Sequence, residues 1–276
     1  MPATSVQRED LQPVLSAHHG NEALVTALEQ AASPERLLSV LGRYIQFNSA
    51  FGAGLANLAG EIAACQGLFQ DPDEPLHIAA DRAAEVAADF FYAAVDEFDD
   101  RATPWRDTHR TLAQATLKGL GTCFGYTDEQ LNDVVRINSA TRTAMDEVWE
   151  GYGIGARLDE TRLFSGMGFH TGSEILADQE FVLIDRHLRQ RRGDLVRSLE
   201  ALRVPILGQQ HNAYYWIRIH TGVEAEHFDA ALKGVNGALR FYAGARAPEA
   251  VKHDILAGFS RFAEVQSAFM SALGEA

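Results

Sequence analysis

Two histidines and a carboxylate stand at metal-ligand spacing in the stretch YYWIRIHTGVEAEHFDAAL. His220, Glu224 and His227 follow one another at intervals of four and three residues. On a continuous helix each residue advances by about 100°, so these three side chains would lie within roughly 40° of one another. Ile217 extends this face and makes it apolar, and a carboxylate on an apolar face must be paired or bound to a cation. A metal site and a solvated His–Glu pair on a helix surface are both open interpretations.

A second group of candidate ligands lies in VDEFDDRATPWRDTHRTL. Glu97 comes near the end of an apolar helical pattern, Asp96, Asp99 and Asp100 crowd the same place, and His109 follows. Acidic residues at a helix C-terminus oppose the helix macrodipole, so several of them together indicate either a bound cation or a solvated loop.

A third group lies in GMGFHTGSEILADQEFVLIDRHL. Glu174 and Glu180 interrupt an otherwise apolar helical pattern, and His170 with Glu174 repeats the HTGxE string found at His220. The repeat suggests two helices that face each other across a shared site. Glu180 and His187, seven residues apart on one stripe, form a rival pair.

Electrostatics favours a metal if these groups converge. Two carboxylates about 4 Å apart repel by about 4 kcal/mol at an effective dielectric constant near 20, and cations remove that cost. Carboxylate and imidazole ligands without thiolate suit Fe(II) or Mn(II), with zinc as a further option. Cys65 and Cys123 form no CxxC pair, so we expect neither a disulfide framework nor a thiolate zinc site.

The elements that must position these residues are helical by pattern. Apolar residues recur at three- and four-residue spacing along most of the chain, and no convincing alternating strand pattern appears. Ser33–Pro34 and Thr127 with Gln130 are helix-start signals. We expect a single all-α domain over residues 21–276 after a loosely ordered leader at 1–20. The predicted helices span about 33–69, 76–98, 103–119, 127–151, 159–170, 173–201, 209–243 and 247–273.

Charge and hydropathy exclude some partners. The chain has 276 residues, a net charge of −14 and a pI near 5.1. Such a surface repels nucleic acid and anionic lipid, so neither is an expected partner. The sequence has no apolar run long enough to span a membrane and no signal-peptide core near Met1, so we expect a cytoplasmic protein. A homodimer is possible on general frequency alone.

The order of the motifs resembles that of the haem-oxygenase-like diiron oxidases and oxygenases. The order is DE…H, then a lone Glu, then HxxxExxH followed by AL…ALRFY, and the resemblance covers roughly residues 35–245. A ferritin-like bundle would need two Glu-x-x-His pairs, and the chain has one, Glu224–His227. The resemblance implies a bundle of about seven to nine helices and six metal ligands: Glu97, His109, Glu174, His220, Glu224 and His227. Asp96 or Asp99 could replace Glu97, Glu180 could replace Glu174, and His170 is a further candidate.

The resemblance also implies a chemistry. Members of this family use two Fe(II) ions and O2, in some cases with an external electron donor, to oxidise a small substrate in natural-product biosynthesis. A free amino acid is the expected substrate, and desaturation, intramolecular C–N ring formation, N-oxygenation and C–C fragmentation are the possible outcomes. Arg136, Arg142 and Arg218 are candidate partners for its carboxylate. The alternatives are a metal-free hydrolase or carrier on the same fold, with Cys123 as a modest nucleophile candidate, and a non-catalytic interaction protein.

Overall fold

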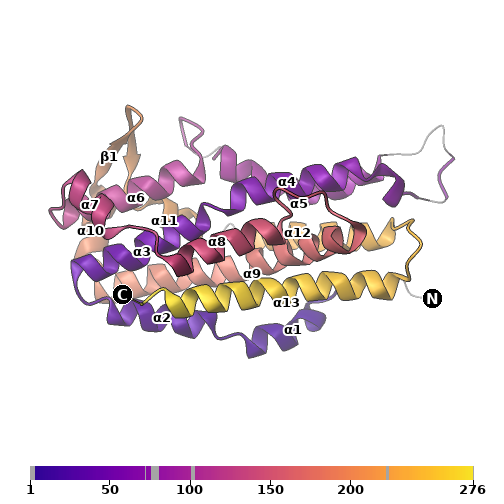
Figure 1. Cartoon of the computed structure of the whole chain (residues 1–276). Coiled ribbons are helices and arrows are strands. Elements are labelled where there is room, and N and C mark those ends of the chain that lie inside the picture. Colours follow the sequence, from indigo (N-terminus) through magenta and orange to yellow (C-terminus); the bar gives the residue numbers. More distant parts are fainter. Residues whose placement is uncertain (1–3, 72, 76–80, 101–102, 222–223, 276) are drawn as a thin grey trace.

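Helices laid lengthwise against one another make up most of the molecule (Figure 1). The computed structural model describes residues 4–71, 73–75, 81–100, 103–221 and 224–275, apart from the side chains of Glu224 and Ala225. The helices of the N-terminal half are α1 (Arg8–Ala17), α2 (Gly20–Gln30), α3 (Pro34–Asn48), α4 (Phe51–Ala64), the short 3-10 helix η1 (Gln66–Leu68), α5 (Arg82–Phe98) and α6 (His109–Cys123). The helices of the C-terminal half are α7 (Asp128–Val134), α8 (Ser139–Gly151), α9 (Glu160–Arg191), α10 (Gly193–Ala201), α11 (Tyr215–Ile219), α12 (Glu224–Arg240) and α13 (Pro248–Ala272).

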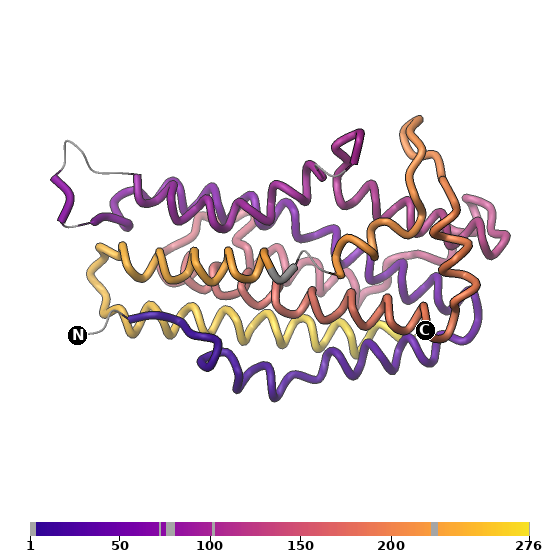
Figure 2. The backbone as a smooth tube through the Cα atoms, turned by 180° about the vertical axis from the view of Figure 1, so that it is seen from behind, coloured from indigo at the N-terminus to yellow at the C-terminus, as the bar shows by residue number. Residues whose placement is uncertain are grey.

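The long helices α9 and α13 pack along each other through the middle of the bundle (Figures 1 and 2). Glycine makes this close approach possible. A Cβ on Gly168 would lie 1.7 Å from the carbonyl oxygen of Ile255, and one on Gly258 would lie 1.8 Å from that of Ser165. The two backbones therefore touch at both places, and α9 is held in a fixed position by its neighbour.

Three further helices enclose the face of α9 that carries the candidate ligands. α5 packs on α4, and α12 packs on both α5 and α9. Phe47 of α3 stacks on Phe269 of α13 with ring centroids 4.1 Å apart, which ties the start of the chain to its end. The prediction of a single all-α domain is confirmed, with one small hairpin added to it. None of the described helices combines the length and apolar character that crossing a bilayer requires.

The capping signals in the sequence mark real helix starts. The Ser33 side chain accepts a hydrogen bond from the backbone N–H of Arg36, with Pro34 at the first helical position of α3. Thr127 and Gln130 form a reciprocal capping box at the start of α7. Residues 8–17 of the expected leader form α1, in which Leu11 is buried.

Several predicted helix boundaries are wrong. The helix predicted at 33–69 is split into α3 and α4, and Asn138 caps a new helix, α8, inside the one predicted at 127–151. Conversely, Glu160–Arg191 forms one continuous helix, α9, because Gly172 packs against the carbonyl oxygen of Phe259 instead of ending the helix. Splitting, together with α1 and α2 before the first predicted helix, accounts for more helices in the described residues than the seven to nine expected.

The helix predicted at 103–119 begins later, at His109. Asp100 and Asp107 pair in an isolated antiparallel bridge, which closes a turn between α5 and α6. The Thr108 side chain then caps α6 by accepting a hydrogen bond from the N–H of Thr111. His109 is thus the first residue of its helix and does not lie one turn inside it.

The helix predicted at 209–243 is the largest error. Strands β1 (Arg203–Ile206) and β2 (Gln209–Asn212) form an antiparallel hairpin, and the short α11 follows before α12 begins at Glu224. Leu207 and Gly208 both have positive φ at the hairpin turn. His220 ends α11, so His220 and His227 do not share one continuous helix face.

Candidate metal centre

A first set of candidate ligands joins α5, α6 and α11. Glu97, His109 and His220 each offer a ligand atom, and these atoms all lie within 4.8 Å of one another. The Nδ1 of His109 lies 3.1 Å from Oε1 of Glu97, and the rings of His109 and His220 meet edge to face at 4.6 Å. Both histidines are buried. Two imidazoles and one carboxylate in this arrangement suit a divalent cation.

Hydrogen bonding fixes the tautomer of His220. Its Nδ1 lies 2.7 Å from the backbone carbonyl oxygen of Trp216, and a carbonyl can only accept, so Nδ1 carries the proton. In the neutral ring the Nε2 atom then has a lone pair to offer a cation. Phe181 stacks on the His220 ring with centroids 4.2 Å apart and holds the ring orientation.

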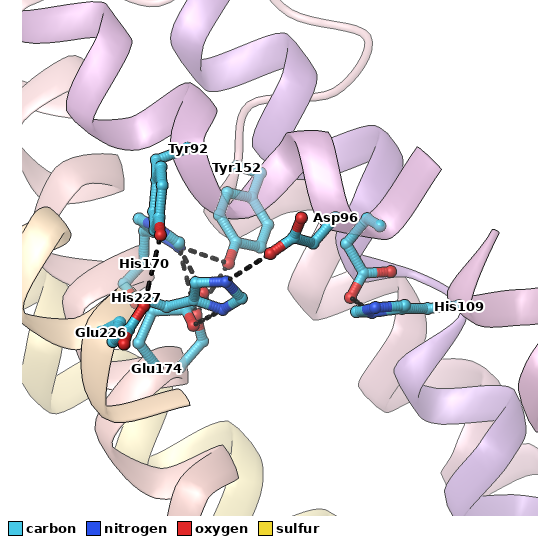
Figure 3. A network of polar contacts seen from close by, with 10 residues as sticks. Tyr92, Asp96, His109, Tyr152, His170, Glu174, Glu226 and His227 are labelled. Carbon is cyan, nitrogen blue, oxygen red and sulfur yellow. Dashed lines mark hydrogen bonds and ion pairs between the residues drawn. The ribbon is translucent and has the colours of Figure 1, made fainter. Parts of the chain in front are cut away.

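A second set joins α5, α9 and α12 (Figure 3). Oε2 of Glu174 lies 3.5 Å from Nδ1 of His227, and its Oε1 lies 3.2 Å from Nδ1 of His170. The other nitrogen of His227, Nε2, lies 3.1 Å from Oδ2 of Asp96. All except Asp96 are buried. One carboxylate lies between two imidazoles, and a second carboxylate lies beside Nε2 of His227, so the second set has the ligand types that suit a divalent cation.

The two sets border one small cavity, called the inner cavity below. It has a volume of about 40 Å³, and its lining includes Glu97, His220, Glu174 and His227. A larger middle cavity, of about 210 Å³, lies on the other side of the first set and is also lined by Glu97, His109 and His220. The inner cavity has room for ions and a few water-sized molecules, and the middle cavity for an organic molecule.

The structure brings together most, but not all, of the residues singled out by sequence. Glu97, His109 and His220 form the first set, and Glu174 and His227 lie in the second. Glu224 begins α12, but its side chain lies outside the described residues. Asp99 pairs with Arg106 through both carboxylate oxygens and takes no part in either set.

Glu180 lines the inner cavity but has other partners. It accepts hydrogen bonds from the Tyr44 hydroxyl at 2.7 Å and from Nε2 of Gln266 at 2.6 Å. His18 in turn lies 2.6 Å from Oε1 of Gln266. Glu180 is therefore held in a buried polar network, and its predicted pairing with His187 does not occur among the contacts described here.

Two members of the second set carried only weak sequence signals. The sequence suggested His170 only through the repeated HTGxE string, and it suggested Asp96 only as an alternative to Glu97. Asp96 and Glu97 are consecutive residues, and one reaches each set. Side chains one residue apart on a helix diverge by about 100°, a spacing that could have suggested this division.

The expected substrate-binding arginines lie elsewhere. Arg136 is exposed and pairs with Asp133, Arg142 is exposed, and Arg218 lies over the ring of Tyr215. None of the three lines the inner or the middle cavity. The expected nucleophile of the alternative interpretation, Cys123, lines neither cavity, and burial raises the pKa of its thiol, which disfavours the reactive thiolate.

Tyr214 and Trp216 pack in the core, whereas Tyr215 between them is half-buried. Tyr214 donates a hydrogen bond to Asp185 at 2.8 Å. Burial, and then this carboxylate, raises the pKa of Tyr214 far above its ordinary value, so its hydroxyl stays protonated. Trp216 is buried against Phe181 and His220 and so supports the first set.

Comparison with known proteins identifies the fold. No protein-family model and no curated protein matches the sequence. Among solved structures, the chain resembles the crystal structure of a TenA homologue from Pseudomonas syringae pv. tomato, with a TM-score of 0.58 and 10% sequence identity. The match covers 96% of this chain and 89% of that chain. The chain thus has the haem-oxygenase-like helical fold. At this level of identity the likeness extends to the fold alone.

Proposed function

We propose that this protein is a non-haem diiron oxidase or oxygenase that uses O2 to oxidise a small substrate. The proposal rests mainly on one observation: two carboxylate–histidine sets, from five different helices, border the same small cavity. Carboxylates gathered around one cavity repel one another, and two divalent cations would remove that cost.

The residues fit two iron ions without thiolate ligands. Glu97, His109 and His220 would hold one ion, and Glu174, His170 and His227 the other, with Asp96 beside His227. The proposal includes Glu224 as a seventh protein ligand, on the resemblance of HxxxExxH to the diiron family. When bound, ferrous ions supply the electrons that activate O2.

The surrounding side chains orient the ligands and exclude water. The Trp216 carbonyl fixes the His220 tautomer, and Phe181 fixes the plane of its ring. Phe47, Phe51 and Phe262 close the inner cavity on the side of α3, α4 and α13. An apolar wall of this kind strengthens the electrostatic interactions of the ligands, because it lowers the local dielectric constant.

The proposed substrate is a free amino acid. Desaturation, C–N ring formation, N-oxygenation and C–C fragmentation are the reactions to be distinguished by product analysis. The middle cavity supports a small substrate, because it has room for one beside Glu97 and His220.

Iron stoichiometry tests the proposal. Full-length protein is loaded with Fe(II) without oxygen, desalted and analysed for iron, beside Glu97→Ala, Glu174→Ala and the exposed His253→Ala as a matched control. We expect about two irons per chain in the wild type and in His253→Ala, and a loss in both glutamate variants. Mixing with O2 in a stopped-flow spectrometer, with a pool of amino acids, should then give a transient visible absorption band. Iron content in the wild type no higher than in the glutamate variants would contradict the proposal.

A further inference from the structure

The middle cavity is lined by one arginine as well as by candidate ligands. Arg110, an exposed residue, lines it together with Glu97, His109 and His220. Arg110 and Ile45 also line an outer cavity of about 330 Å³ between α6 and α7. Arg110 and Ile45 are therefore shared by the outer and middle cavities.

Arg110 has no carboxylate partner among the described residues, as is also true of Arg142 and Arg162. Its charge is therefore not neutralised by an ion pair of the kind that Arg82 and Arg106 make. The acidic side chain of the outer cavity, Asp128, lies 3.5 Å from Lys118. The first turn of α6, which contains Arg110, has no acidic residue, so the positive end of the helix dipole adds to the charge of the guanidinium.

The remaining wall of the middle cavity is mainly apolar. Ile45, Ala53, Phe98, Ala113 and Trp216 form most of it. The volume of about 210 Å³ is below the roughly 300–1,000 Å³ typical of pockets for drug-sized ligands, which points to a smaller molecule.

One polar side chain of the middle cavity also lines the inner cavity. Asn48 lines both the inner and the middle cavity, and its Nδ2 donates to the carbonyl oxygen of Tyr44 at 3.0 Å. The Oδ1 atom of the same amide is an acceptor, suited to a donor group on a ligand such as an ammonium.

We propose that the middle cavity binds a small molecule with one carboxylate and an apolar body. Arg110 holds the carboxylate through paired N–H donors, and the body lies against Ala53, Ala113 and Trp216 with its far end at Glu97 and His220. This assignment rests on the proposed function in one respect. The far end of the molecule is placed at the first ligand set because the proposed oxidation would take place there. The binding itself requires only the cavity and Arg110.

Binding to the metal-free full-length protein tests the assignment. Isothermal titration calorimetry is carried out with leucine and phenylalanine and with their amides, which lack the carboxylate. We expect the acids to bind the wild type and the amides to bind at least roughly tenfold more weakly, because the charge-assisted contact is lost. Arg110→Gln should weaken the binding of the acids by a similar factor, and Arg110→Lys should weaken it by less. The exposed position of Ala53 allows Ala53→Phe to fill the cavity with little disturbance of the core, and this variant should abolish binding.

Arg136→Gln is the matched control, because Arg136 is, like Arg110, an exposed arginine but does not line the middle cavity. It should bind the acids as the wild type does. Equal affinity of acid and amide, unchanged affinity in Arg110→Gln, or no binding of either acid to the wild type would overturn the proposal. Iron content separates this proposal from the preceding one. Arg110-dependent binding in a protein that takes up no iron would refute the diiron function alone, and normal iron uptake without acid binding would refute the carboxylate site alone.

Discussion

The Nδ1 atom of His220 lies 2.7 Å from the carbonyl oxygen of Trp216, four residues earlier in the chain. The contact uses the backbone of Trp216, so changing the side chain should not alter the tautomer of His220. We expect Trp216→Phe to keep the metal content of the wild type and His220→Ala to lose about one metal ion per chain. Metal analysis after loading with Co(II) measures both. An equal loss in the two variants would show that the indole, and not the carbonyl, is the important group.

Asp96 and Glu97 should act on different metal ions. Asp96 contacts His227 of the second set, and Glu97 contacts His109 of the first. Removing an outer carboxylate partner of a ligating histidine typically weakens metal affinity about 10–100-fold. We expect Asp96→Asn to weaken one of two Co(II) binding steps by this factor, and Glu97→Gln to weaken the other. Titrations followed by Co(II) absorption resolve the two steps, and weakening of the same step by both variants would contradict the division.

Glu174 and Glu180 are expected to have different roles, metal binding for Glu174 and structural hydrogen bonding for Glu180. Glu174 lies between two histidines, whereas Glu180 accepts from Tyr44 and Gln266. Glu174→Gln should therefore lose metal. Glu180→Gln should keep metal and lose about 1–3 kcal/mol of unfolding free energy, because one buried donor is left without its acceptor. Urea unfolding and metal analysis of both variants measure the two effects, and a loss of metal in Glu180→Gln would reverse the assignment.

The contact between α9 and α13 predicts opposite effects of two glycine substitutions. A Cβ at Gly168 would lie 1.7 Å from a backbone oxygen of α13, so Gly168→Ala should force the helices apart and destabilise the protein severely. Gly60 is an exposed position inside α4 with nothing within 4 Å of its Cβ, so Gly60→Ala should stabilise the protein by about 0.5–1 kcal/mol. Thermal unfolding compares the two. Equal midpoints would show that the two helices do not touch at Gly168.

The protein should lose stability in mild acid, partly through His18. Burial lowers the pKa of His18, an effect that its hydrogen bond to Gln266 only partly offsets. The unfolded chain then binds a proton at higher pH than the folded chain. The contribution is fully present above the unfolded pKa of about 6.5 and is lost as the pH falls below it.

A variant of His18 isolates this contribution. His18→Gln does not titrate and can still donate a hydrogen bond to Gln266. Its unfolding free energy should fall less than that of the wild type between pH 7.5 and pH 5.5, as measured by urea unfolding. Parallel pH profiles would show that His18 makes no such contribution.

The sequence predicts the helices well where capping and periodicity agree. Ser33–Pro34 and Thr127 with Gln130 mark starts that the structure confirms. The hairpin was missed because Pro205 argues against a strand, and because the turn has Leu207, a residue type that rarely adopts positive φ. Tertiary packing also decided against a break in α9, since Gly172 is a contact with α13 and not a helix end.

The candidate site was predictable in its residue types and less so in its arrangement. The short intervals in HTGVEAEH suggested one helix face. However, α11 ends at Ile219 and α12 begins at Glu224, so His220 and His227 do not belong to one helix. His109 and Glu97 meet because the turn between Asp100 and Asp107 brings the first residue of α6 next to the last turn of α5, a contact that helix periodicity cannot encode. Arg110 had no sequence signal of its own, because its role depends on which cavity it lines.

Asn48, Glu97 and His220 line both the inner and the middle cavity and so form a partition between a space of about 40 Å³ and one of about 210 Å³. Such a partition sorts molecules by size. Water, ions and diatomic gases fit on one side of it, and an organic molecule is confined to the other. Selectivity for the bond that reacts would then come from which carbon or nitrogen atom of the confined molecule reaches the partition, and enlarging a single residue on the wide side should change the position of reaction before it changes the rate.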